Sequence, residues 1–413
     1  MTNQRIVLMV QNSVLGDARV LKTASVAAQT GAEVTVLGVS PTEVAETFPM
    51  DDFTVLRLPI TRKLIRHGRS VNNAARYGVM PLTYPDTSSK HAEAIRLKEM
   101  QKYRKYAFPG SERIEIAINE TQRVHNQRVG AASLDHNAEQ VNASWLGSQP
   151  DHWSRVLWEV IEYNSVLLPA LRDLNPDGIH LHDAMLLATV SLYVREREVK
   201  GSPPWFIYDA HELVPGMSVT DSRLPHLIRA YTSLEEDFAG VADQMITVSP
   251  ALARNLKERL SLPKEPSVIY NCPPLNAARQ PCDRNLRQEL NLDPNTPLMV
   301  YSGILAPGRG VDLAMDALAY LPEAHLAIIC VPSIRSHPAE VIRGIAETNP
   351  QRDRIHFLEP VAPEQVTSYL KEADVGLLPL RDYPSHSVAL ANKLFEYAFA
   401  GLPVVASDLP AQA

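Results

Sequence analysis

Short apolar runs alternate with amphipathic stretches along most of the chain. The first run covers residues 5–10 (RIVLMV), a helical pattern follows over 18–30, and a second apolar run covers 33–39. Strands that are apolar on both faces are typical of parallel sheets covered by helices. The pattern therefore predicts a βαβ unit that opens a doubly wound α/β sheet.

The alternation continues in two series. In the first we expect strands near 54–58, 178–181, 205–208, 244–248 and 267–270, and helices near 152–174, 185–197, 223–241 and 250–260. A proline-rich stretch, 271–285, has the character of a linker. In the second series we expect strands near 298–302, 325–330, 355–358, 375–378 and 403–406, and helices near 312–320, 339–347, 363–372 and 389–399.

This organisation predicts two domains, 1–275 and 286–413, which a hydrophobic content of 45% in 413 residues can support. The second ends directly after a strand with no closing helix, so we expect an incomplete C-terminal domain. A net charge of −7 argues against nucleic acid as a partner. Three scattered cysteines and the lack of a long apolar run favour the cytoplasm.

Polar, helix-favouring sequence interrupts the first series over about 61–150. Residues 61–106 hold 11 Lys/Arg against 3 Asp/Glu, although the chain as a whole is acidic. A basic segment of this kind is suited to contact with an anionic membrane surface or a lipid diphosphate. A solvated helical insertion fits the composition equally well. The aromatic members of the segment, which suit an interface, are Tyr77, Tyr84, Tyr103, Tyr106 and Phe108.

A glycine-rich turn follows the first strand of the second series. The segment 301–313 reads YSGILAPGRGVDL and includes Gly303, Gly308, Arg309 and Gly310. Glycines allow close approach of a ligand to the backbone, helix N-termini attract anions, and a guanidinium matches phosphate oxygens. The turn therefore predicts a diphosphate site, although a solvated strand-to-helix turn explains this segment alone equally well.

The predicted helix 389–399 carries Asn392, Lys393 and Glu396. A carboxylate at this edge of a sheet can accept hydrogen bonds from both ribose hydroxyls. The alternative is an exposed Glu396 that pairs with Lys393 on the same helix face.

Together these two segments resemble the donor site of glycosyltransferase family 4, the retaining class with the GT-B fold. The match rests on Asn392-Lys393-x-x-Glu396-Tyr397, on 401–405 (GLPVV), and on Gly303 with Arg309-Gly310. The resemblance implies two Rossmann-like domains facing each other across a cleft. It also implies a nucleotide-sugar donor held by the C-terminal domain, an acceptor held by the N-terminal one, and no metal or other cofactor.

Three motifs of the first half resemble the same family. They are Gly16-Asp17-x-Arg19, His180-x-His182-Asp183 and Tyr208-Asp209-Ala210-His211-Glu212, and the last two follow strands. The resemblance implies that His182 and Asp183 act with Arg309 in catalysis. It also implies that a second set of residues faces the acceptor or sugar, namely Gly16, Asp17, Arg19, His211 and Glu212. Hydrogen-bonded turns explain the His-Asp and His-Glu pairs without chemistry. A metal held by His180, His182, His211 and Glu212 is a weaker alternative.

The resemblance implies transfer of a sugar, with retention of configuration, to a glycan or lipid-linked acceptor in bacterial envelope or polysaccharide biosynthesis. We expect a cytoplasmic enzyme with peripheral contact at the inner face of the membrane. Ala389 and Ile304 stand where the family pattern has a second Glu and an Arg. These departures keep open a degenerate nucleotide-sugar-binding protein, beside a GT-B nucleotide-sugar epimerase. An NAD enzyme is disfavoured because no Gly-x-Gly-x-x-Gly follows a strand.

Overall fold

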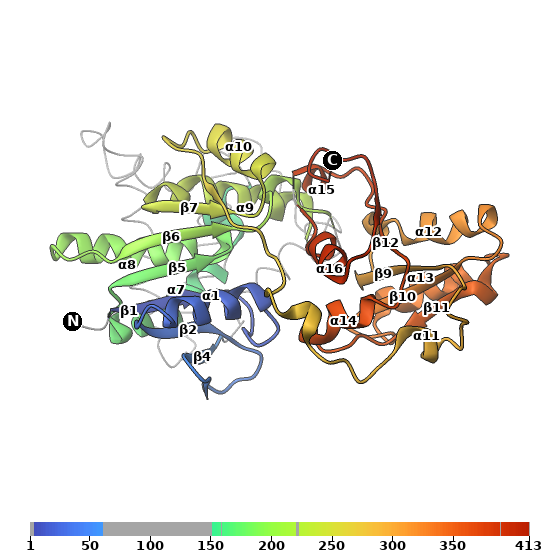
Figure 1. Cartoon of the computed structure of the whole chain (residues 1–413). Helices are drawn as coiled ribbons and strands as arrows, with labels where there is room; N and C mark the ends of the chain where they lie inside the picture. Colours follow the sequence, from blue (N-terminus) through green and yellow to red (C-terminus); the bar gives the residue numbers. More distant parts are fainter. Residues whose placement is uncertain (1–3, 61–150, 158, 220–222, 389, 413) are drawn as a thin grey trace, which may run out of the picture. The chain divides into compact units, whose positions relative to one another are not determined.

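A computed structural model describes residues 4–60, 151–157, 159–219, 223–388 and 390–412. By internal contacts the chain divides into two compact units, Met1–Thr247 with Asn255–Ser267, and Val248–Arg254 with Val268–Ala413. Figure 1 shows that each unit is built around its own sheet. The basic segment predicted over 61–150 lies outside the described residues.

The sheet of the first unit has eight described strands in the order β3-β4-β2-β1-β5-β6-β7-β8. Strands β4, β2, β1, β5, β6 and β7 pair in parallel, and only the β3–β4 pairing is antiparallel among those whose direction is resolved. The strand bounds are β1 Arg5–Met9, β2 Glu33–Ser40, β3 Glu46–Pro49, β4 Thr54–Pro59, β5 Gly178–His182, β6 Trp205–Ala210, β7 Gln244–Thr247 and β8 Ser267–Val268. The strands that follow β1 are added on one side of it up to β4 and on its other side from β5 onward, so the strand order changes direction between β1 and β5. The loops after these strands therefore flank a topological switch point, where open α/β sheets bind ligands.

The described helices in this part of the chain are α1 and α6 to α10, and α10 is divided between the two units. Their described bounds are α1 Ala18–Ala28, α6 Trp153–Val156, α7 Glu159–Leu174, α8 Leu187–Val199, α9 Pro225–Phe238 and α10 Pro250–Arg259. The buried face of α1, including Val20 and Ala24, packs with Leu8 of β1 and Val36 of β2 in one apolar cluster. The βαβ unit expected at the start of the chain is thus present.

The sheet of the second unit is wholly parallel among its described strands, in the order β11-β10-β9-β12-β13. The strand bounds are β9 Leu298–Ile304, β10 His325–Val331, β11 Ile355–Leu358, β12 Val375–Leu378 and β13 Val404–Ala406. The winding reverses between β9 and β12. A second switch point therefore lies at the loops that follow these two strands.

Apolar side chains of the second sheet are buried on both faces. Along β10, Leu326 and Ile328 belong to one core cluster, whereas Ala327 and Ile329 belong to another. This double burial explains the continuous apolar runs in the sequence. The helix bounds are α11 Leu286–Glu289, α12 Val311–Ala317, α13 His337–Glu347, α14 Val366–Leu370, α15 Pro384–Val388 and α16 Asn392–Ala400.

The structure confirms the α/β class and all the strands expected from apolar runs. Three short elements were not predicted, the antiparallel strand β3 and the helices α11 and α15. The helix expected over 152–174 is formed as α6 and α7, and the helix expected over 389–399 begins at Asn392. These differences affect the ends of elements and leave the order of the sheets unchanged.

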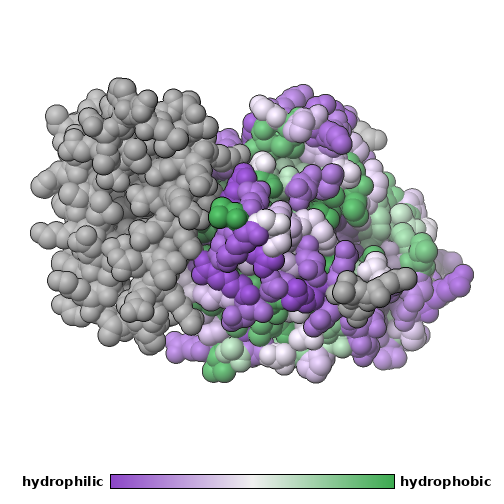
Figure 2. Space-filling view, turned by 90° about the vertical axis from the view of Figure 1, so that its left-hand side faces the viewer, coloured by the Kyte–Doolittle hydropathy of each residue, from purple (hydrophilic) through white to green (hydrophobic). Residues whose placement is uncertain are grey.

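The described surface is mixed in polarity. On the face drawn in Figure 2, hydrophilic side chains predominate and hydrophobic ones are scattered between them. Within the described residues, no helix combines the length and the apolar character that crossing a bilayer requires.

Candidate functional site

Asp209 is fully buried in β6 and gathers polar side chains from several elements of the first unit. Arg19 of α1 donates to both of its carboxylate oxygens, from Nε and from Nη2, each over 2.8 Å. Nδ1 of His182, at the end of β5, lies 3.3 Å from Oδ2 of Asp209, and Nε2 of His211 lies 3.1 Å from the same oxygen. The structure thus brings together three predicted site residues around a carboxylate that the sequence analysis did not select.

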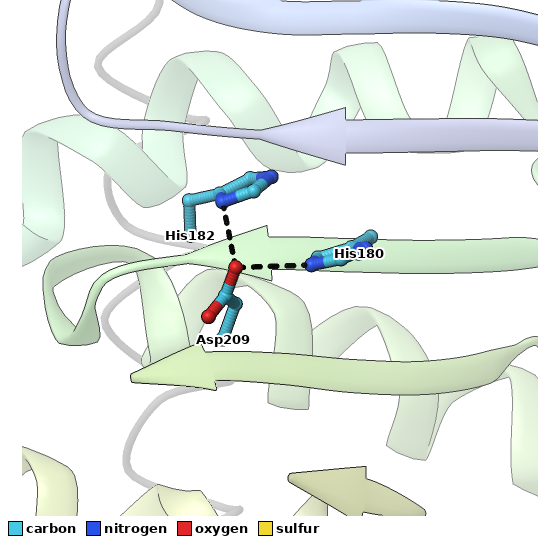
Figure 3. A group of neighbouring side chains, drawn as sticks. All are labelled: His180, His182 and Asp209. Atoms are coloured by element: carbon cyan, nitrogen blue, oxygen red, sulfur yellow. Dashed lines mark ion pairs between the residues drawn. The ribbon is translucent and has the colours of Figure 1, made fainter. Parts of the chain in front are cut away.

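His180 completes this Asp209 cluster from inside β5. Its Nε2 lies 3.6 Å from Oδ2 of Asp209, and its ring stacks on that of His182 with centroids 4.5 Å apart. Figure 3 shows the two imidazoles converging on one carboxylate oxygen. Burial by itself would raise the pKa of Asp209, but hydrogen bonds from the three histidines and Arg19 outweigh it and hold that pKa well below its usual range. The centre of the cluster is therefore an anion.

His182 is electrically neutral at physiological pH. Its side chain has no exposure to solvent, and this burial is the main reason why its pKa falls to about 4. Nδ1 lies between Oδ2 of Asp209, at 3.3 Å, and Nε2 of His211, at 3.2 Å, so the tautomer decides whether it donates or accepts. Nε2 is buried and has no hydrogen-bond partner in the described part of the chain. The zero exposure of the ring indicates that His182 acts by holding its neighbours in place.

Asp183 has a conformation that non-glycine residues rarely adopt, with φ of +65°. Its backbone N–H donates to the carbonyl oxygen of Asp209 over 3.1 Å, and its carboxylate lies 3.3 Å from Nδ1 of His211. Burial raises the pKa of Asp183 to about 6, although His211 opposes the rise. For His211, the carboxylates of Asp209 and Asp183 outweigh burial and raise the pKa. A strained backbone beside titratable groups of this kind is typical of functional sites.

His180, His182 and Asp209 have ligand atoms close enough together to hold a metal ion. However, Arg19 already pairs with both oxygens of Asp209, so a metal there would stand beside a guanidinium charge. Glu212, from the set considered on sequence grounds, is exposed. The donor set therefore fits a hydrogen-bonded network better than a metal centre.

The loop before α1 has a structural role in the first unit. Asp17 is the N-cap of α1, where its carboxylate accepts from the backbone N–H of Val20 over 3.2 Å and from Asn12 over 2.8 Å. Gly16 has open space around its Cα, so a side chain would fit there. The role of both residues toward an acceptor or sugar stays a prediction.

In the second unit, the glycine-rich loop follows β9 and packs closely against its neighbours. At Gly310, where φ is +64°, a Cβ atom would lie 1.8 Å from the carbonyl oxygen of Pro379, so both conformation and space require glycine. At Gly308 a Cβ would lie 2.6 Å from the ring of Tyr383. These two glycines make room for the segment after β12, whereas the sequence analysis expected them to make room for a ligand.

Helix α16 is fixed to the sheet by a buried tyrosine. The hydroxyl of Tyr397 accepts from the backbone N–H of Ser302 over 3.1 Å and lies 3.2 Å from the carbonyl oxygen of Leu377. Lys393 lies one helical turn earlier on the same face. Its Nζ lies 2.9 Å from the position of a Cβ on Gly303 and 5.0 Å from the centre of the Tyr301 ring. The fold thus places the ammonium group directly over the glycine-rich loop.

Two cations share this part of the second unit. Burial, followed by the positive charge of Arg309, lowers the pKa of Lys393 to about 8, and Glu396 offsets part of the effect. The side chain of Arg309 makes no hydrogen bond or ion pair within the described residues. Asn392 is exposed at the first position of α16. Lys393 and Arg309 therefore form a cationic site beside the loop, which favours an anion. Binding of a donor diphosphate there stays a prediction.

The sequence analysis missed the segment that follows β12. Arg381 donates from its backbone N–H to the carbonyl oxygen of Gly308 over 2.9 Å and from Nε to that of Pro307 over 3.1 Å. Its guanidinium also pairs with Asp312. His386 lies on the same segment, in α15. These residues belong to no motif, so the sequence carries no signal for them. They lie near the glycine-rich loop because β9 and β12 are neighbours in the sheet and their carboxyl ends meet at the switch point.

Both halves of the chain match sequence models of known families. Residues 121–275 match the family described as Glycosyltransferase Family 4, and residues 296–413 match the one described as Glycosyl transferases group 1. The chain therefore has the GT-B fold, as the solved structures below show, and each half is similar to a sequence family of glycosyltransferases.

Among curated proteins, the chain is 29% identical over 185 residues to the D-inositol 3-phosphate glycosyltransferase of Acidothermus cellulolyticus, covering 42% of this chain and 40% of that one. It is 26% identical over 266 residues to the enzyme of that name from Nocardia farcinica, covering 61% and 54%. The matches thus span roughly half of these relatives' length or less.

Among solved structures, sucrose-phosphate synthase from Thermosynechococcus elongatus superposes with a TM-score of 0.60 at 14% identity, covering 98% of this chain and 82% of that one. An Escherichia coli trehalose-6-phosphate protein bound with UDP-2-fluoro glucose has a TM-score of 0.57 at 14% identity, covering 99% and 85%. At this identity the likeness establishes the fold.

Proposed function

We propose that the protein transfers a sugar from a nucleotide-diphosphate sugar to a glycan or lipid-linked acceptor, with retention of anomeric configuration. The observation that carries the proposal is the pair of cations, Arg309 and Lys393, beside the loop that follows β9. The positive charge of Arg309 contributes to the lowered pKa of Lys393, so the two cations repel each other. A bound anion would stabilise both of them. A diphosphate supplies that anion, and Glu396 on the same helix supplies the carboxylate for the ribose.

In the proposed mechanism the second unit stabilises the leaving group. The bond between the anomeric carbon and the diphosphate oxygen breaks while Arg309, Lys393 and the backbone amides near Gly303 neutralise the negative charge that develops. The acceptor hydroxyl attacks the anomeric carbon from the face that the diphosphate leaves, and its proton passes to the departing phosphate oxygen. No covalent enzyme intermediate is required for retention by this route.

We assign the acceptor to the first unit. The ring of His182 is fully buried, so in this proposal it positions Asp209 and His211 for the acceptor. Asp183, His211 and the exposed Glu212 would bind hydroxyls of the acceptor near the same strand ends. A role in bacterial envelope or polysaccharide synthesis agrees with the putative teichuronic acid biosynthesis glycosyltransferase TuaH of Bacillus subtilis, which is 37% identical over 51 residues, 12% of this chain and 13% of that one.

We propose that the reaction needs no metal ion, because charge on the leaving group is met by side chains. Activity that is unchanged after treatment with EDTA would support this, and loss of activity restored by Zn²⁺ or Mg²⁺ would contradict it. Peripheral attachment to the inner face of a membrane, through the basic segment 61–106, is part of the same proposal. Co-sedimentation with anionic vesicles that is weakened by salt would support it.

The test is a thermal-shift screen against UDP, GDP, ADP, CMP and dTDP sugars, since a ligand that binds only the folded protein raises its melting temperature. UDP-glucose comes first because an E. coli relative by fold is described as bound with UDP-2-fluoro glucose. Product analysis with and without acceptors, D-inositol 3-phosphate among them, then separates transfer from epimerisation and from binding alone. NMR of the product reads its configuration. An exposed arginine of the same unit, Arg335, provides a control, Arg335→Ala, for Arg309→Ala.

A further inference from the structure

His386 lies against the glycine-rich loop that follows β9. A Cβ atom on Gly308 would lie 3.1 Å from Cε1 of His386, so the imidazole rests on the backbone of the loop that carries Arg309. The ring also stacks on Tyr383, with centroids 5.4 Å apart. The two strands that carry these segments, β9 and β12, flank the switch point of the second sheet.

The orientation of the imidazole is fixed by one hydrogen bond. Nδ1 of His386 lies 2.8 Å from the carbonyl oxygen of Arg381, and because a carbonyl can only accept, Nδ1 carries the proton. Arg381 is itself held to the loop through Gly308, Pro307 and Asp312. Nε2 makes no hydrogen bond within the described residues and is not sealed from solvent. Nε2 of His386 is therefore available to bind a ligand.

The charges around His386 are cationic. Burial, and then the charges of Arg309 and Lys393, lower its pKa, while the bond to the Arg381 carbonyl partly opposes them. The imidazole is therefore mostly neutral at pH 7. A diphosphate beside Arg309 and Lys393 would reverse the local charge and favour the protonated ring.

We propose that His386 is a third ligand of the donor diphosphate, beside Arg309 and Lys393, and that it binds a phosphate oxygen through Nε2. This inference rests on the proposed function, because it concerns the same donor site. On binding, Nε2 takes up a proton from solvent and becomes a charged donor, so the site adds a positive charge when its ligand arrives. Arg381 is a positioning residue that holds the ring in place.

The test uses the full chain, with UDP and GDP as probes, in isothermal titration calorimetry at pH 7 in two buffers that differ in ionisation enthalpy. The dependence of the binding enthalpy on the buffer gives the number of protons taken up. His386→Asn retains a group in the place of Nδ1 and so preserves the bond to Arg381, but it has no atom at Nε2. His386→Gln retains a neutral donor near Nε2. His337→Asn, at an exposed position of α13, is the matched control.

We expect His386→Asn to bind the probe about tenfold more weakly than the wild type and to take up fewer protons. His386→Gln should recover part of the affinity without the proton uptake, and His337→Asn should behave as the wild type. Lys393 contributes only about a tenth of a proton at pH 7, because its pKa is about 8. Protons exchanged by the probe itself cancel in the comparison between proteins.

Wild-type affinity and wild-type proton uptake in His386→Asn would overturn the inference and leave the proposed function intact. If the wild type bound neither UDP nor GDP nor any nucleotide sugar of the thermal-shift screen, the proposed function would be wrong. This inference would then be wrong as well. Circular dichroism verifies that the variants fold. Should His386→Asn fail to fold, proton uptake in His386→Gln equal to that of the wild type would overturn the inference.

Discussion

Replacing Lys393 with methionine should stabilise the protein while weakening its hold on a diphosphate. Methionine has a similar length and no charge, so it removes the buried ammonium and keeps most of the packing. The pKa of Lys393 falls from 10.5 to about 8, mainly through burial. The difference between these two values corresponds to a destabilisation of roughly 3 kcal/mol at neutral pH.

The sign follows from proton binding. The folded protein releases the Lys393 proton near pH 8, whereas the unfolded chain retains it up to about pH 10.5. Below pH 8 both states are protonated and the full penalty applies. Between these values the unfolded chain binds more protons, so the free energy of unfolding of the wild type rises with pH. The stabilisation by Lys393→Met should therefore be largest near pH 7 and should shrink toward pH 10.5.

Urea unfolding followed by far-ultraviolet circular dichroism provides the assay. Tryptophan fluorescence would miss the second unit, because all four tryptophans lie between residues 145 and 205. Arg335→Met, at an exposed position of the same unit, is the control and should change stability little. A variant less stable than the wild type at pH 7, or a difference in stability independent of pH, would refute the reasoning.

Three further changes test the two units separately. Arg309→Ala should lower turnover by about 10² to 10³, because it removes a cation that faces the leaving group; normal turnover in a steady-state assay would rule out its assignment. Glu396→Ala should chiefly weaken nucleotide binding, and an unchanged dissociation constant in calorimetry would count against a ribose contact. Asp209→Asn should destabilise the first unit by about 3 to 5 kcal/mol, since Arg19 would lose its buried counter-charge. Urea unfolding followed by tryptophan fluorescence would measure this loss, and a change below about 1 kcal/mol would contradict the account.

Most of the architecture was predictable because parallel strands buried on both faces appear as apolar runs. The strand β3 escaped prediction because it is a short strand at the edge of the sheet, with every residue at least partly exposed. Helix α15 escaped because it has only five residues and begins with a proline. Elements this short form through contacts with neighbouring segments. They are too short to show a periodic pattern of apolar residues.

The candidate site was only partly predictable. The motifs identified His182 and His211, and their strands are adjacent in the sheet. They did not single out Asp209, although a carboxylate inside an apolar strand requires a buried partner. His386 has no motif around it, and its place on the loop depends on the order of β9 and β12. The apolar pattern of the sequence predicts which segments are strands. Which strand ends lie next to each other depends on the order of the strands in the sheet.

The hydrogen bonds between Arg19 and Asp209 join positions 190 residues apart along the chain. The entropy lost on closing so long a loop grows only with the logarithm of its length, by about 0.6 kcal/mol for each doubling. A change in the length of a connection between elements in this stretch would therefore alter the entropy of closure little. The carboxylate and its four cationic or imidazole partners would keep their arrangement under such a change.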